Sequence, residues 1–404
     1  MTLDCNHPNT KVKKRLEAIY NLNPAKSIFR LDEGPYIDLL EKLGNPHLQC
    51  PPTIHVAGTN GKGSTIAFLK SLYEAEGKIV HAYNSPHLLT FNERITVAGK
   101  HIDDDTLIKY LDKIETANEG APLTFFEYTT ALAFSVFADY PADILLLETG
   151  LGGRLDCTNV VRAPIATIIT PIGYDHMDWL GTDINAIAGE KAGIMKPNAP
   201  CFIATQNYDV NHVLKDKAKE VGCDIHFIER INDLPELGLI GDHQKDNASV
   251  ALSVAPYFGL TKGSQALKNT KWPARMEKIS DKPEIWFDCG HNIDGARTIA
   301  KQLKQWKSEN SSRPIHLVIG LASDKNAQDF IHPMIDYIDS ITCIDLMNAR
   351  NPQNGEDLVS KLNITCPKYT KKTISDAVDF ISQSNGIIIV TGSLYLYEQI
   401  KDRI

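Results

Sequence analysis

The feature of this chain that most constrains its fold is a glycine-rich segment at residues 55–65, HVAGTNGKGST. An apolar, β-branched run at residues 53–56 precedes the segment and predicts a strand, and a run with helical periodicity at residues 65–73 follows it. A strand, a glycine loop and a helix in this order are the context that a phosphate-binding loop needs. We therefore predict an α/β fold with a phosphate site at this junction.

The chemistry of the loop suits phosphate groups. Glycines let backbone N–H groups turn toward one point, and the N-terminus of the following helix adds about half a positive charge. Lys62 supplies a full cation, and the hydroxyl of Ser64 or Thr65 can reach a magnesium ion. The spacing departs from the standard G-x-x-x-x-G-K-[ST] pattern, so an ordinary glycine-rich turn is the alternative. The residues predicted to face the phosphates are Gly58, Thr59, Asn60, Gly61, Lys62, Gly63, Ser64 and Thr65.

Length, charge and cysteine content limit the class of protein. A chain of 404 residues predicts two domains. The net charge of −8 and the lack of a long basic block argue against nucleic acid or an anionic membrane as a partner. Eight scattered cysteines without a C-x-x-C pair are typical of reduced thiols. With no signal-peptide core and no apolar run near the roughly 18 residues of a membrane span, we expect a cytoplasmic protein.

Strand-like and helix-like segments alternate along the chain, which predicts mostly parallel sheets with right-handed crossovers. A polar stretch at residues 262–283 is the predicted boundary between domains 1–270 and 271–404. In the first domain, residues 124–138 are apolar on nearly all sides and predict a buried helix. In the second, the predicted strands are 284–287, 315–319, 341–345 and 387–390, and the predicted helices are 296–306, 327–338, 355–362, 374–382 and 394–401.

Three apolar strands lead to polar residues that could meet beside the glycine loop, namely Ser85, Glu148 and His176. Ligands in parallel sheets bind beyond the carboxyl ends of the strands, so these side chains are candidates for an open magnesium site. Glu148 ends an otherwise apolar strand, where a carboxylate must find a partner. Ser85 could instead be a turn residue before Pro86, and His176 a structural loop histidine.

The roles of several other polar residues are open to interpretation from the sequence alone. Lys191 follows Glu190 on a predicted helix, and this pattern favours a solvated lysine paired with a neighbouring acid. Asp288 ends a strand and could accept hydrogen bonds from a ribose, with His291 packing against a base, although a helix cap at Asp288 or Asn292 fits equally. Arg275 could clamp a phosphate or be a surface arginine.

Taken together, the motifs resemble the folylpolyglutamate synthase and dihydrofolate synthase family, relatives of the Mur ligases. The resemblance extends along most of the chain, in one order. The matching segments are 55–65, 85–87 (SPH), 124–127 (TFFE), 148 with 150–156 (GLGGRLD), 175–181 (DHMDWLG), 190–194 (EKAGI), 241–244 (GDHQ) with 247–248, 288 with 291–292, and 391–393 (TGS).

The resemblance implies a P-loop-containing, Mur-ligase-like central domain with a mostly parallel sheet and a smaller, Rossmann-like α/β C-terminal domain. The loop with Lys62 would hold ATP, and the catalytic residues would be Lys62, Lys191 and His176. Two Mg²⁺ ions would be bound by Ser85, Glu148, His176 and a carbamylated Lys191. Nucleotide contacts would also come from Asn247, Arg275, Asp288 and His291, and the pteroate pocket would be lined by Thr124, Phe126, Asp156 and Cys157.

The sequence also departs from the family pattern at several positions. Asn84 stands where serine is usual, Cys157 where alanine is common, Ala274 where glycine precedes Arg275, and Cys289-Gly290 where Gly-Ala is usual. Residues 28–34 match the family's first loop loosely. The bulk of Cys157 beside the expected pterin bears on substrate preference.

We therefore expect an ATP-dependent acid–amino acid ligase that adds L-glutamate to dihydropteroate and to tetrahydrofolate through an acyl phosphate. Its partners would be these small molecules, and the protein would act as a monomer. A Mur-type ligase acting on UDP-linked muropeptides and a non-catalytic nucleotide-binding protein are the alternatives. A dinucleotide-binding oxidoreductase fits less well, since its G-x-G-x-x-G loop does not require Lys62.

Overall fold

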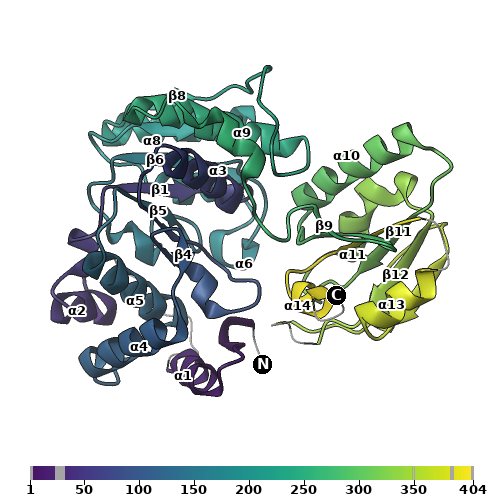
Figure 1. Cartoon of the computed structure of the whole chain (residues 1–404), viewed down its shortest axis with the longest axis horizontal. Helices are drawn as coiled ribbons and strands as arrows, with labels where there is room; N and C mark the ends of the chain where they lie inside the picture. Colours follow the sequence, from purple (N-terminus) through teal and green to yellow (C-terminus); the bar gives the residue numbers. More distant parts are fainter. Residues whose placement is uncertain (1–2, 23–31, 348, 350, 383–385, 402–404) are drawn as a thin grey trace. The chain divides into compact units, whose positions relative to one another are not determined.

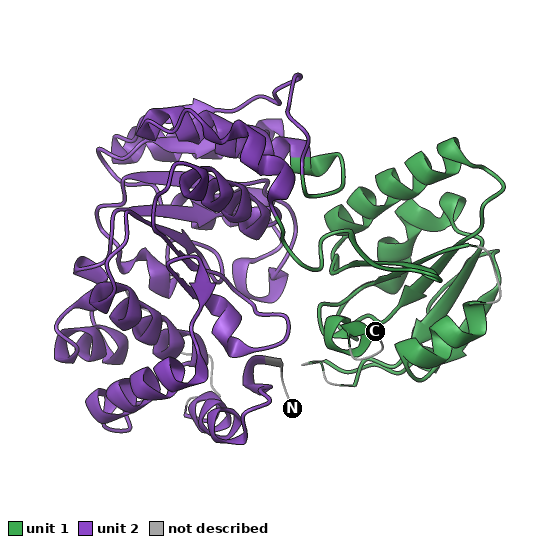
Figure 2. Ribbon diagram, viewed as in Figure 1, with its two compact units in different colours: residues 1–3, 238–244, 271–404 green, residues 4–237, 245–270 purple. Residues whose placement is uncertain are grey.

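The computed structural model describes residues 3–22, 32–347, 349, 351–382 and 386–401 (Figure 1). The chain divides into two compact units (Figure 2). The larger unit contains Asp4–Leu237 and Lys245–Thr270, and the smaller unit contains Met1–Leu3, Gly238–Gln244 and Lys271–Ile404. Of the loop expected at residues 28–34, residues 28–31 lie outside the described part. No helix within the described ranges is long and apolar enough to cross a membrane.

The larger unit is built on an eight-stranded sheet of order β4-β3-β2-β5-β1-β6-β7-β8. The six strands β2, β5, β1, β6, β7 and β8 are parallel to one another. Strands β3 and β4 extend the sheet beyond β2 in antiparallel pairing. Central β1 and β5 are buried along their whole length, as expected for strands covered on both faces. The strands are β1 Thr53–Ala57, β2 Val80–Tyr83, β3 Ile95–Val97, β4 Lys100–His101, β5 Ile144–Glu148, β6 Ala166–Ile169, β7 Cys201–Ile203 and β8 Ile225–Phe227.

Helices cover this sheet and form its hydrophobic cores. The predicted buried helix is α5, which begins after a capping box between Thr124 and Glu127 and is buried along most of its length. In Figure 1, α1, α2, α4 and α5 lie together, and they share one core with β5. The helices are α1 Thr10–Tyr20, α2 Pro35–Lys42, α3 Lys62–Ala75, α4 Asp104–Asn118, α5 Phe125–Asp139, α6 Met177–Leu180, α7 Ile184–Ala192, α8 Tyr208–Val221 and α9 His243–Val254.

The smaller unit has a six-stranded sheet of order β13-β12-β11-β14-β10-β9, parallel except for β9. The predicted alternation of strands and helices is confirmed there. The strands are β9 Glu277–Asp281, β10 Glu284–Asp288, β11 Ile315–Ile319, β12 Ser340–Ile344, β13 Lys368–Lys371 and β14 Ile387–Thr391. The helices are α10 Ile293–Glu309, α11 Ala327–Ile331, α12 Gly355–Ser360, α13 Ile374–Ile381 and α14 Leu396–Lys401.

The structure adds two elements near the predicted boundary and shortens one predicted helix. The polar stretch at residues 262–283 contains the division between the two units, at Thr270 and Lys271, and also two elements that were not predicted, a 3-10 helix, Gly263–Asn269, and the edge strand β9. Edge strands are commonly charged, so β9 lacks the apolar pattern that reveals central strands. The helix predicted at 327–338 ends at Ile331 and continues as a 3-10 helix, since Pro333 has no N–H to donate.

Candidate active site

The glycine loop connects β1 to α3 and has no room for side chains at two positions. Gly58 has φ +150°, and a Cβ there would lie 1.8 Å from Thr170 Oγ1. Gly61 has φ +86°, and a Cβ there would lie 2.4 Å from Asn247 Oδ1. Asn247 is therefore packed directly against the loop.

The sequence suggested that the N–H groups of the loop face one point, but two of them are used elsewhere. Those of Thr59 and Asn60 donate to the carbonyl oxygen of Pro171, at 3.0 and 3.2 Å. The first turn of α3, which begins at Lys62, offers N–H groups for an anion, because the first donors of a helix have no partner within it.

Four of the predicted residues meet at the carboxyl ends of β1, β2 and β5. Lys62 Nζ lies 3.8 Å from Glu148 Oε1 and donates to the Gly58 carbonyl at 3.2 Å. Glu148 Oε2 accepts a hydrogen bond from the Ser85 N–H at 3.3 Å. Lys191 Nζ donates to the same Gly58 carbonyl at 3.0 Å. Of the three residues expected to meet beside Lys62, the structure brings Ser85 and Glu148 together there.

The interpretation of Lys191 as a solvated, acid-paired lysine was wrong. Its side chain is buried, with 4% of the residue exposed, because α7 packs this face against the glycine loop. The neighbouring acid, Glu190, pairs instead with Arg154. Burial, reinforced by the charge of Lys62, lowers the pKa of Lys191 to about 7. The neutral amine of Lys191 is therefore accessible near neutral pH, unlike that of an exposed lysine.

This lowered pKa makes a prediction about stability. Between pH 7 and 10 the unfolded chain keeps the Lys191 proton while the folded chain has lost it, so raising the pH favours the folded state. Relative to Lys191→Met, the wild-type free energy of unfolding should rise by about 2–3 kcal/mol from pH 7 to pH 9. Urea titrations of both proteins in CO₂-free buffer measure this difference. If the free energy of unfolding changes with pH by the same amount in both proteins, the lowered pKa of Lys191 is contradicted.

His176 lies on the loop after β6, where its backbone is left-handed (φ +52°) and its side chain exposed. The preceding Asp175 interacts electrostatically with Lys191. Within the described ranges, no three His, Cys, Asp or Glu side chains converge closely enough to hold a metal ion. Metal binding by His176 therefore stays a prediction.

The residues around Glu148 nevertheless fit magnesium by their chemistry. Glu148 is 5% exposed, and Thr65 Oγ1 is buried without a hydrogen-bond partner among the described residues. Carboxylate and hydroxyl oxygens are the hard donors that Mg²⁺ prefers.

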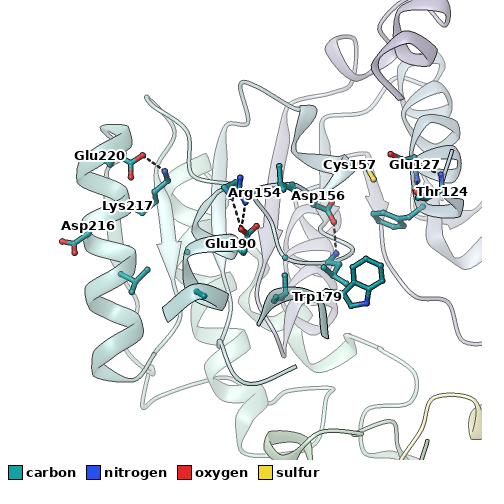
Figure 3. A pocket seen from close by; sticks show the side chains of 18 residues that line it. Thr124, Glu127, Arg154, Asp156, Cys157, Trp179, Glu190, Asp216, Lys217 and Glu220 are labelled. Carbon is teal, nitrogen blue, oxygen red and sulfur yellow. Dashed lines mark hydrogen bonds and ion pairs between the residues drawn. The ribbon is translucent and has the colours of Figure 1, made fainter. Parts of the chain in front are cut away.

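A cavity of about 1040 Å³ lies in the larger unit, beside the loop that follows β5 (Figure 3). The four predicted substrate residues, Thr124, Phe126, Asp156 and Cys157, all line it. At Gly150 a Cβ would lie 2.3 Å from the Phe126 ring, so glycine is needed there. The structure thus brings these residues together, and their contact with pteroate stays a prediction.

Sequence reasoning missed the other half of this cavity. In Figure 3, Arg154 and Glu190 lie between Asp156 on one side of the cavity and α8 on the other. Nη2 and Nε of Arg154 donate to Glu190 Oε1, at 2.7 and 3.0 Å. Arg154, Glu190 and Trp179 fall within the family motifs, which was an available signal. The wall formed by α8 carries no motif; its lining residues are Val213, Asp216, Lys217 and Glu220.

In the smaller unit, the predicted nucleotide residues surround the end of β10. Asp288 is buried, and its two oxygens accept from the N–H groups of Gly290 and Met276, at 2.8 and 2.9 Å. His291 lies beside it, with Nδ1 3.1 Å from the Cys289 carbonyl oxygen. The helix cap is Asn292, which accepts from the Gly295 N–H at 2.8 Å. Ribose and base contacts by Asp288 and His291 stay predictions.

Arg275 lies in a strained turn. Both its neighbours have left-handed backbones, with φ +60° at Ala274 and +44° at Met276. The turn is held by Glu277, whose carboxylate accepts from the Ala274 N–H at 2.8 Å, and by Asp288. The glycine that is usual before Arg275 would adopt this conformation without strain.

Ala274→Gly should therefore stabilise the smaller unit by about 0.5–1 kcal/mol, since a left-handed alanine costs about 1–2 kcal/mol and the added flexibility of glycine offsets part of the gain. Urea unfolding measures the change. The matched control is Ala296→Gly, at a buried position inside α10, which should cost about 1 kcal/mol. Equal destabilisation by both substitutions would contradict the account of strain.

Comparisons with known proteins agree with this geometry. Two family models match the chain: the Mur ligase middle domain at residues 56–236 and the dihydrofolate synthetase C-terminal domain at residues 274–402. The Bacillus subtilis protein named dihydrofolate synthase/folylpolyglutamate synthase is 32% identical over 415 residues, which cover 92% of this chain and 94% of its own. The Lacticaseibacillus casei folylpolyglutamate synthase is 30% identical, with the same coverage.

Solved structures of such enzymes superpose on the whole chain. Escherichia coli FolC in complex with DHPP and ADP matches with a TM-score of 0.86 and 26% identity, over 96% of both chains. The Yersinia pestis bifunctional enzyme complexed with AMPPNP and Mn matches with a TM-score of 0.86 and 26% identity, over 100% of this chain and 99% of its own.

The fold and the phosphate-binding loop define an ATP-dependent ligase of the Mur ligase type, which forms carbon–nitrogen bonds. Within that class, the chain belongs to the folylpolyglutamate synthase and dihydrofolate synthase family. The resemblance noted in the sequence and the predicted fold class are confirmed.

Proposed function

We propose that this chain ligates L-glutamate to dihydropteroate and to tetrahydrofolates that carry glutamate tails. The observation that carries the proposal is the position of the Asp156 cavity, which shares the loop after β5 with the Lys62–Glu148 cluster. A carboxylate in this cavity and a phosphate on the glycine loop could meet there. The names of the relatives, which include both activities, support this pairing.

In the proposed reaction, a carboxylate oxygen of the pteroyl acid attacks the γ-phosphorus of ATP, and ADP leaves. The amine of L-glutamate then attacks the carbonyl of the acyl phosphate, loses a proton, and displaces phosphate. The protein contributes positioning and charge neutralisation. Lys62 and the first N–H groups of α3 would hold the transferring phosphate, and Asn247 would order the loop against which it packs.

Magnesium would neutralise the phosphate oxygens when bound. We propose two ions, held by Ser85, Glu148, His176 and Lys191, and the Mn ion in the Yersinia pestis structure supports a divalent metal. Arg275, Asp288 and His291 of the smaller unit would contact the nucleotide. All proposed ligands are small molecules, and we propose that the active form is a monomer.

We further propose that Lys191 is carbamylated. Its neutral amine, at a pKa of about 7, can attack CO₂ and release a proton, which replaces a buried cation with a carboxylate. That anion would lie beside Lys62 and the Gly58 carbonyl, where it could serve as a metal ligand.

The test is phosphate release from ATP with L-glutamate, with dihydropteroate and tetrahydrofolate offered separately. We expect release with both acceptors and little without glutamate. Release only with a UDP-linked muropeptide precursor would favour the Mur-type alternative. Slow ATP turnover that glutamate leaves unchanged would favour a non-catalytic nucleotide-binding protein.

A further inference from the structure

A buried histidine in the central strand connects the glycine loop to the cavity. His55 lies in β1, three residues before Gly58, and is fully buried between β5 and β6. Its Nε2 lies 2.8 Å from the hydroxyl of Thr158, which is also fully buried. Burying an imidazole in a parallel strand is costly unless it is hydrogen-bonded, so this contact is a strong constraint.

The directions of the hydrogen bonds follow from chemistry. The Thr158 hydroxyl forms a short hydrogen bond with Asp156 Oδ1, and a carboxylate only accepts, so Thr158 donates. The Thr158 oxygen must then accept from His55, which places the imidazole proton on Nε2. Burial lowers the pKa of His55 to about 3, so the ring stays neutral. Its Nδ1 has no hydrogen-bond partner among the described residues.

The chain of bonds ends at the wall of the cavity. Asp156 is 3% exposed and lines the cavity. Its Oδ2 accepts from the Leu151 N–H at 2.8 Å, and its Oδ1 accepts from the Thr158 N–H at 3.0 Å as well as from the hydroxyl. The carboxylate is therefore fixed on one side by the loop after β5 and on the other by Thr158 and His55.

We propose that His55 and Thr158 are positioning residues that fix the Asp156 carboxylate for the N–H donors of the pteroyl substrate. The inference rests on the proposed function, in which Asp156 faces that substrate. Neither residue lines the cavity, so both act only through Asp156. A purely structural role would instead lower stability without a selective effect on one substrate.

The test compares KM for dihydropteroate with KM for ATP and with kcat. Thr158→Val should raise KM for dihydropteroate about tenfold, the usual effect of losing a hydrogen bond to a charged group, with KM for ATP and kcat within about twofold of wild type. Thr158→Ser keeps the hydroxyl and should restore wild-type KM. His55→Leu should raise the same KM about threefold, and His55→Gln, which retains a donor, should raise it less.

Thr342→Val is the matched control, because Thr342 is fully buried in β12 of the smaller unit. It should leave every kinetic constant unchanged. Thermal melting checks that each variant folds. The positioning role of Thr158 is wrong if Thr158→Val and Thr158→Ser have the same KM for dihydropteroate. It is also wrong if KM for ATP and kcat change as much as KM for dihydropteroate. Asp156→Asn tests the contact of Asp156 with the substrate separately from the positioning of Asp156 by His55 and Thr158. If this variant leaves KM for dihydropteroate unchanged, the proposed substrate pocket is wrong.

Discussion

Lys62→Ala is expected to lower kcat for glutamate ligation by about 100-fold or more. Lys62 lies at the start of α3, 3.8 Å from Glu148, where it would face the transferring phosphate. Removing a preorganised charge donor from such a position costs about 3–4 kcal/mol in the transition state. Steady-state rates of phosphate release with dihydropteroate and glutamate measure the effect.

Lys70→Ala is the matched control for this experiment. Lys70 lies on the same helix but pairs with Glu74 at the surface, at 2.9 Å. It should leave kcat within about twofold, since surface ion pairs contribute little. A loss of less than tenfold for Lys62→Ala would mean that the loop does not hold the transferred phosphate.

Lys191→Ala should have the second large effect, a loss of about 100-fold in kcat, if the carbamate supplies a negative charge at the reaction centre. A short carboxylate such as propionate should restore part of the activity, because the substitution leaves space near the Gly58 carbonyl. The wild-type enzyme should also lose activity in CO₂-free buffer and regain it on addition of bicarbonate.

A second lysine, which is partly buried, provides the control for this chemistry. Burial lowers the pKa of Lys196 to about 8, but its Nζ donates to Asn159 and not to the glycine loop. Lys196→Ala should keep the dependence of activity on bicarbonate. A carbamate resonance on Lys191 should appear in ¹³C NMR with ¹³C-bicarbonate. Fully active enzyme without that resonance would contradict the carbamate.

The convergence of Ser85 and Glu148 beside Lys62 was predictable because the carboxyl ends of neighbouring parallel strands share one edge of a sheet. The glycine loop was predictable for a related reason, since its strand, loop and helix are contiguous in sequence. The four residues of the cavity followed from motifs shared with a family and could not have been found from spacing alone.

What sequence reasoning missed depends on packing between distant segments. The burial of Lys191 results from the contact of α7 with the glycine loop, and nothing in its local pattern separates it from a surface lysine. The α8 wall of the cavity has no motif, and His55 and Thr158 are 103 positions apart. Strand β9 was missed because a charged edge strand resembles a linker.

If this site activates the carboxylate of a pteroyl acid by phosphorylation, an oxygen atom must pass from that carboxylate to phosphate. Dihydropteroate labelled with ¹⁸O in its carboxylate would be incubated with ATP and L-glutamate, and the released phosphate analysed by mass spectrometry. We expect one ¹⁸O atom in each phosphate released, in a quantity equal to that of the ligated product. Unlabelled phosphate formed at the same rate as the product would contradict it.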